Sequence, residues 1–340
     1  MKDKKWVIAW LIAGAVMVAS MVLIGGITRL THSGLSITEW KLIMGTIPPL
    51  NDAEWNAAFE QYQQFPEYQK VNRHFTLSEF KSIFFWEYLH RLIGRMIGMV
   101  FIIPFIIFLV RKSMSRKLIF QSLALFGLGA LQGFLGWFMV KSGLVDRPSV
   151  SHFRLAIHLS AAFLTFCFIL WVILSIQMPN RESLASKRSA VLARVLVAVV
   201  SLQIIFGAFV AGLKAGLVFP TWPKMGADWI PSSVMADIQS GGLSSLFTQI
   251  VSVQFVHRTF AYVVLVLVGY LWFASRKESL NHFQNKTIQF LVVMVLIQFA
   301  LGVFTLLYLV PVSLGVIHQF GALLLLSASV VLMYGFPIKK

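Results

Sequence analysis

The sequence has little charge for a chain of 340 residues. Asp, Glu, Lys and Arg together make up 12% of the residues, whereas a soluble domain carries roughly 25%. So few charges could not cover a soluble globule of this length, and 58% of the residues are hydrophobic. The composition therefore excludes an ordinary soluble protein and indicates a helical protein that crosses a membrane several times.

Cysteine is also nearly absent. The single thiol, Cys167, excludes an intrachain disulfide and a metal site built from several cysteines. It falls inside an apolar run, where a free thiol usually behaves as a small buried hydrophobic group.

Long apolar runs are what the sequence has in abundance. We expect the first to be a span rather than a signal peptide, because it is too long for a signal peptide and no clear cleavage site follows. The sequence predicts an all-α, polytopic membrane protein with eight transmembrane helices. The eight runs, each near the roughly 20 residues that a spanning helix needs, cover residues 6–27, 84–109, 118–140, 154–176, 191–212, 250–273, 288–309 and 313–335.

The net charge of +16 is unevenly distributed over the loops. The termini, the loops on their side of the membrane and Arg194 hold 16 of the 29 Lys and Arg residues but three of the 13 acidic residues. Because basic residues accumulate on the cytoplasmic side, both termini are predicted to be cytoplasmic. The orientation of the chain in the lipid bilayer therefore explains the excess of basic residues, and no nucleic-acid partner is needed to account for it.

Four short motifs recur in the same order in the two halves, 1–180 and 181–340. Each half has an even number of spans, so the halves share one orientation, and we predict two pseudo-symmetric four-helix bundles. The matched motifs are Gly34-Leu35 and Trp40 with Gly216-Leu217 and Trp222, Leu89-His90-Arg91 with Val256-His257-Arg258, Leu131-Gln132 and Gly136 with Ile297-Gln298 and Gly302, and Ala156-Ile157-His158 with Val316-Ile317-His318.

Histidines His90, His158, His257 and His318 lie at similar depth in the predicted spans. A single intramembrane histidine is often a packing residue or an interface anchor, but four at repeated positions indicate a function. Zinc sites need three or four protein ligands, whereas a heme iron needs one or two. We therefore predict two heme sites, one in each half, held by pairs of imidazoles from facing helices.

The halves differ beside the first histidine of each pair. Glu87 precedes His90 by three residues and shares its helix face, and the equivalent residue is Gln254. A carboxylate beside a heme can accept a proton or stabilise positive charge, which an amide cannot do by ionising. This predicts a reactive first half and a stable redox second half, although Glu87 could instead pair with Arg91 or Arg95.

Arginines near the same ends of the spans are candidates for the two heme propionates. Arg29, Arg91 and Arg258 could bind these carboxylates through the guanidinium fork. They could equally be interfacial residues with no ligand.

These residues together resemble the heme A synthase family over essentially the whole chain. The resemblance is carried by residues 25–40, 87–95, 152–159, 254–258 and 315–319. It implies that His257 and His318 are axial ligands of heme b, and that heme O, the substrate, binds near His90, His158 and the catalytic Glu87. The family oxidises the C8 methyl of heme O to a formyl group through heme I, the hydroxymethyl form, and so makes heme A for terminal oxidases.

The resemblance also has limits. Some members carry a cysteine pair in their outer loops, and this chain resembles the cysteine-free, proteobacterial and mitochondrial-like subgroup. Partners implied by the resemblance are the heme O synthase (a protoheme farnesyltransferase) and a membrane or quinone-linked electron partner. From the residues alone, a bis-histidine di-heme electron-transfer cytochrome stays an alternative; a transporter is a weaker one, because the spans lack paired acids.

Overall fold

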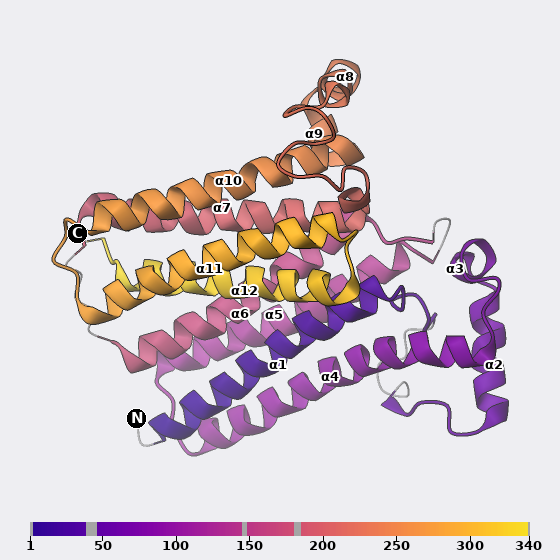
Figure 1. Ribbon diagram of the computed structural model, residues 1–340. Coiled ribbons are helices and arrows are strands. Elements are labelled where there is room, and N and C mark those ends of the chain that lie inside the picture. Colours follow the sequence, from indigo (N-terminus) through magenta and orange to yellow (C-terminus); the bar gives the residue numbers. More distant parts are fainter. Residues whose placement is uncertain (1–2, 39–45, 145–147, 180–184, 339–340) are drawn as a thin grey trace. The chain divides into compact units, whose positions relative to one another are not determined.

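The computed structural model describes residues 3–38, 46–144, 148–179 and 185–338, and this part of the chain is all-helical apart from turns and loops (Figure 1). The chain forms two compact units, Met1–Ala162 and Phe163–Lys340. The boundary between them falls inside a long helix, α6. The predicted boundary at residues 180 and 181 lies outside the described residues, and so does Trp40 of the predicted repeat.

Within the described residues, eight helices are long and apolar enough to cross a membrane, which confirms the predicted number. Each of the eight predicted spans coincides with one of them. Their bounds are α1 Lys4–Leu30, α4 Leu77–Val110, α5 Arg116–Lys141, α6 His152–Gln177, α7 Lys187–Gly212, α10 Ile250–Ser275, α11 His282–Leu307 and α12 Val312–Gly335.

Several helices begin before the apolar run that predicted them, because polar caps extend them. At the start of α4, Thr76 and Glu79 form a capping box in which each side chain bonds to the other's backbone. Asn281 and Gln284 form the same arrangement at the start of α11. Hydropathy alone does not register these turns, since capping residues are polar.

In the first unit, α1 and α4 run side by side (Figure 1). The Trp10 indole donates to the carbonyl of Val100 (3.2 Å), and the Thr28 hydroxyl reaches the carbonyl of Trp86 (3.3 Å). These bonds tie the two helices near both ends of α1.

Two shorter helices, α2 (Asp52–Gln63) and α3 (Pro66–Lys70), lie at the end of α4 that begins with Leu77 (Figure 1). The first long loop is therefore partly helical. Aromatic side chains join them to α4: Phe80 is fully buried, with its ring centroid 5.1 Å from that of Tyr62 and 5.2 Å from that of Phe59. Burial and the nearby Glu67 carboxylate raise the pKa of Tyr62, which stays a hydrogen-bond donor.

In the second unit, α7 runs along α10, α11 runs along α12, and α7 also packs on α12 (Figure 1). The Gln284 amide donates to the carbonyl of Gly335 (2.8 Å), joining α11 to α12. Four short helices follow α7 or precede α10: η2 Ala215–Leu217, α8 Ser232–Gly241, η3 Gly242–Ser244 and α9 Ser245–Thr248.

The loop between α10 and α11 is tied to the start of α7 through Glu278. Its carboxylate accepts hydrogen bonds from the hydroxyls of Ser186 (2.6 Å) and Ser189 (2.7 Å) and from the Ser186 amide (3.0 Å). Burial raises the pKa of Glu278, but these three donors outweigh it and hold the pKa below its ordinary value.

The two units repeat local backbone detail as well as sequence. His32 follows α1 with a φ of 56°, and Lys214 follows α7 with a φ of 54°. Both lie two residues before the glycines of the first repeated motif, Gly34 and Gly216. A left-handed residue at both places is uncommon for non-glycine residues, so this turn is a duplicated feature.

The packing of α2 and α3 on α4 yields a first prediction. Replacing Phe80 with Ala should weaken the docking of residues 52–70 by about 3–5 kcal/mol, because a fully buried ring is lost. Amide hydrogen exchange in α2 would then accelerate. The matched control is Phe85→Ala on the same helix, where the ring is 53% exposed and exchange in α2 should not change. Equal effects of the two variants would contradict the packing described.

Candidate functional site

The four intramembrane histidines form one pair in each unit. His90 on α4 and His158 on α6 interact electrostatically in the first unit. His257 on α10 and His318 on α12 do the same in the second. Each histidine lies in the first half of its helix and is half-buried. This arrangement is compatible with the pairing predicted from sequence, and the role of the pairs stays a prediction.

The rings of these histidines have few polar partners. The Nδ1 atoms of His90, His158 and His257 are buried and accept or donate no hydrogen bond within the described residues. Buried polar atoms in native proteins are nearly always satisfied, and an exception often marks the place of a bound group. The orphaned nitrogens are consistent with imidazoles that bind a ligand.

A glutamine on the preceding helix holds the second histidine of each pair. Gln132 on α5 donates to the backbone carbonyl of His158 (3.0 Å), and Gln298 on α11 donates to that of His318 (2.8 Å). The Gln298 amide nitrogen also lies 3.2 Å from His318 Nδ1. The repeat identified both glutamines, but their role follows only from the structure.

Glu87 is deeply buried and fully hydrogen-bonded. One carboxylate oxygen accepts from the Ser36 hydroxyl (2.8 Å) and the Ile37 amide (2.7 Å). The other is 2.6 Å from Nη2 of Arg91 in an ion pair, which was one of the open alternatives. Arg91 Nη2 also donates to the carbonyl of Ile37 (2.8 Å). Glu87 and Arg91 together fix the chain that leaves α1 onto α4.

In the second unit, the segment after α7 is likewise held by a side chain of α10, but here the side chain is the hydrogen-bond donor. Gln254, the counterpart of Glu87, donates to the carbonyl of Phe219 (3.2 Å). Phe219 stands in the segment after α7 at the position that Ile37 occupies after α1. The first unit therefore places a charged pair where the second has a neutral amide.

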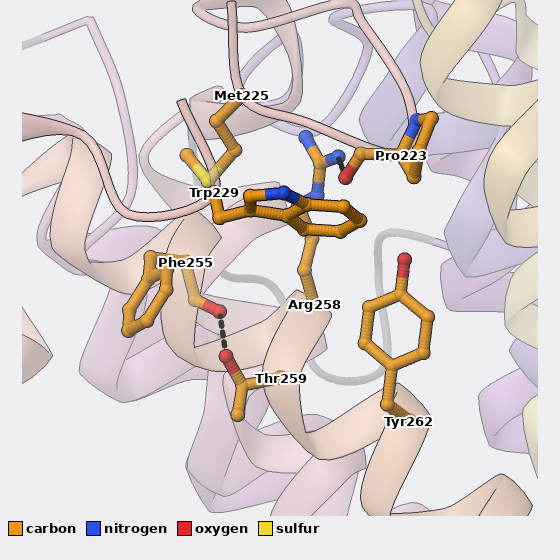
Figure 2. Close-up of a pocket in the computed structure, with 7 residues that line it drawn as sticks. All are labelled: Pro223, Met225, Trp229, Phe255, Arg258, Thr259 and Tyr262. Atoms are coloured by element: carbon orange, nitrogen blue, oxygen red, sulfur yellow. Dashed lines mark hydrogen bonds between the residues drawn. The ribbon is translucent and has the colours of Figure 1, made fainter. Parts of the chain in front are cut away.

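Arg258 contributes to a cavity of about 270 Å³ beside α10. Its Nη2 donates to the carbonyls of Pro223 (2.9 Å) and Lys224 (3.1 Å). Its Nη1 and the hydroxyl of Tyr262 are buried without a hydrogen-bond partner among the described residues. Figure 2 shows Arg258 and Tyr262 under the loop that carries Pro223 and Trp229.

Two unsatisfied donors in one cavity suit an anionic or carbonyl group. Sequence reasoning singled out Arg258 but missed Tyr262; the signal available was its position four residues later on the same helix face. Arg29 on α1, another of the predicted propionate residues, likewise has its Nε buried without a partner among the described residues.

The donor set limits which metal group could bind. Among the described residues, no group of three or more His, Cys, Asp and Glu side chains could hold a metal ion. Each unit instead offers two imidazoles, and two nitrogens of this kind match the axial positions of a heme iron.

Comparison with known proteins places the chain among related sequences. A family model described as cytochrome oxidase assembly protein (COX15-CtaA) matches residues 8–330. A protein named heme A synthase from Flavobacterium johnsoniae is 52% identical over 330 residues, covering 96% of both chains. A protein of the same name from Flavobacterium psychrophilum is 50% identical, over 99% of both chains. Another from Paramagnetospirillum magneticum is 45% identical, over 94% of this chain and 91% of its own.

The buried ion pair yields a second prediction. Arg91→Leu leaves the Glu87 carboxylate buried without its guanidinium partner, which should lower the free energy of unfolding by about 3–5 kcal/mol. Thermal unfolding of the purified protein in detergent measures the loss. Arg258→Leu, at the equivalent position without a carboxylate, should cost clearly less. The double variant Glu87→Gln with Arg91→Leu should recover much of the loss, and failure to recover it would contradict the charge argument.

Proposed function

The chain belongs to the heme A synthase family and is an oxidoreductase that converts heme O to heme A in a membrane; we propose that the first unit binds heme O as substrate and the second holds heme b. In this proposal His90 and His158 are ligands of the substrate iron. His257 and His318 are the axial ligands of heme b.

The observation that carries the proposal is the repeated pair of half-buried imidazoles, one pair in each unit. A single iron porphyrin takes up to two axial ligands, so four histidines in two pairs correspond to two hemes. The orphaned Nδ1 atoms and the lack of a larger metal-binding cluster among the described residues support this assignment.

The difference at Glu87 and Gln254 supports the assignment of the substrate to the first unit. The formation of a formyl group from a methyl group, through the hydroxymethyl of heme I, consists of two successive two-electron oxidations that release protons. Positive charge that develops at the porphyrin edge would be stabilised by a fixed carboxylate. At this position beside the first histidine, the first unit offers a carboxylate and the second does not, since Gln254 is neutral.

The contacts of Glu87 favour one of its two predicted roles. Glu87 is the acceptor in each of its described hydrogen bonds, and the donors are the Ser36 hydroxyl, the Ile37 amide and the Arg91 guanidinium. Such a carboxylate is arranged to carry a negative charge, so we assign Glu87 to charge stabilisation at the substrate rather than to proton acceptance. When heme b is bound, it supplies one-electron transfer, and this chain's residues hold it in place.

The arginines are assigned to heme propionates where their nitrogens are unsatisfied. Arg258 with Tyr262 would bind a propionate of heme b, and Arg29 one of the substrate, because each presents a buried nitrogen or oxygen without a partner in the described part. Arg91 is engaged by Glu87 and Ile37, so any propionate contact would use its remaining donors.

The proposal extends to the cellular setting. The charge distribution supports a bacterial inner-membrane location with both termini cytoplasmic, which puts the histidine pairs near the periplasmic face. The partners that fit are the heme O synthase, which would deliver the substrate, and a quinone-linked or other membrane electron carrier.

The sequence alone left open a bis-histidine electron-transfer cytochrome that performs no chemistry on the porphyrin, and membership of the heme A synthase family decides against it. The repeated histidine pairs alone would suit it equally well. The Glu87 junction in the first unit favours the enzyme, because a symmetric electron carrier has no need of a charged pair in one half.

Pigment analysis of Glu87→Gln tests both readings. The purified wild-type protein should yield heme b together with heme O, heme I or heme A after extraction. Glu87→Gln should keep the heme b absorbance and accumulate heme O without heme A, since the fixed charge is lost. The matched control is Glu79→Gln, on the same helix, which should behave as wild type.

Two results would contradict the proposal. Heme b as the sole pigment of the wild type would favour the electron carrier. Normal heme A formation by Glu87→Gln would remove Glu87 from the mechanism.

A further inference from the structure

Each of the four paired histidines lies against a glycine of a neighbouring helix. A Cβ atom added to Gly25 on α1 would lie 3.0 Å from Cε1 of His90, and one added to Gly136 on α5 would lie 3.2 Å from Cε1 of His158. In the second unit, Gly207 on α7 meets His257 at 3.1 Å and Gly302 on α11 meets His318 at 3.0 Å.

Other glycines of the same kind of helix show no such contact. A Cβ at Gly14, Gly133 or Gly269 would have nothing within 4 Å among the described residues. Gly14 shares α1 with Gly25, and Gly133 shares α5 with Gly136. Close contact with an imidazole is therefore specific to four positions and is not a general property of glycines in these helices.

The four positions are also duplicated. Gly25 and Gly207 are 182 residues apart, the same separation as Gly34 and Gly216 of the first repeated motif. Gly136 and Gly302 are 166 residues apart, as are Gln132 and Gln298. We call the space beside each of these glycines, which the imidazole occupies, a slot. Each unit thus carries one slot for each of its two histidines, at equivalent places in the repeat.

The ring edge that enters the slot carries both nitrogens. Around Gly207, Cε1 of His257 is closest and Nδ1 follows at 3.6 Å; around Gly302, Nδ1 and Nε2 of His318 both lie at 3.6 Å. Glycine lets the imidazole approach the neighbouring backbone this closely.

A side chain in the slot would displace the ring. Carbon atoms in favourable contact are about 3.5–4.0 Å apart, so an alanine methyl would push Cε1 and the adjacent nitrogens away by a few tenths of an ångström. Groups that orient a metal ligand typically change metal affinity by about 10- to 100-fold when altered.

We propose that Gly25, Gly136, Gly207 and Gly302 are positioning residues for the axial histidines, and that their bare backbone sets the direction in which each imidazole presents its nitrogen to iron. The inference rests on the proposed function, since it needs a heme between each pair. It predicts that replacing one of these glycines weakens the binding of heme in its own unit and leaves the heme of the other unit unchanged.

The test compares Gly207→Ala with Gly269→Ala in the full-length protein. Bound heme b is followed by the reduced-minus-oxidised spectrum while excess apomyoglobin captures released heme, and the midpoint potential is titrated. Gly207→Ala should lose heme b about tenfold faster and with a shifted potential, whereas Gly269→Ala should match wild type. In the first unit, Gly136→Ala should retain less heme O than Gly133→Ala, with heme b unchanged.

A second measurement separates positioning from a general folding defect. In a His257→Ala background the clash is gone, so adding Gly207→Ala should not lower the thermal unfolding temperature. Loss of stability in that background, or heme b retention by Gly207→Ala equal to that of Gly269→Ala, would overturn the inference. A wild-type protein without a bis-histidine heme would instead overturn the proposed function on which it rests.

Discussion

An imidazole buried among apolar helices needs a polar partner, because an unsatisfied polar group in hydrocarbon costs several kcal/mol. In each of the two units, the helices, glycines and glutamines around the histidine pair can be understood as an arrangement that accommodates buried imidazoles. The helices bring two histidines together, glycines admit their rings, and glutamines fix the backbone of the second histidine. Three of the four rings have an Nδ1 atom without a hydrogen-bond partner among the described residues. These unpaired atoms are consistent with a bound group. In our proposal that group is an iron porphyrin.

The repeated motifs provide two similar sites, and in our proposal one difference between them, Glu87 in the first unit and Gln254 in the second, separates their chemistry. Glu87 and Gln254 both attach the segment after the first helix of their unit, but the first accepts a hydrogen bond from a backbone amide and the second donates one to a carbonyl. The same structural task is therefore performed with a charge in one unit and without it in the other. In our proposal this difference makes the first site reactive and the second a stable redox site.

Hydropathy was sufficient to predict the eight long helices. The repeated motifs led us to pair His90 with His158 and His257 with His318, and this pairing stays a prediction. The early starts of α4 and α11 were missed because capping boxes are polar. The bonds from Ser36 and Ile37 to Glu87 depend on the path of a loop, which no periodicity encodes. Gly25 and Gly207 were likewise not recognised as neighbours of histidine, since glycine in a membrane helix usually signals only close helix packing.

The central claim is that an imidazole pair holds a heme iron, and electron paramagnetic resonance of the purified, oxidised protein tests it most directly. The account predicts low-spin ferric signals of bis-imidazole hemes, and the component that belongs to heme b disappears in both His257→Ala and His318→Ala. It should persist in His282→Ala, whose exposed ring lies at the start of α11. A colourless protein after incubation with heme, or an unchanged signal in His257→Ala, would contradict the account.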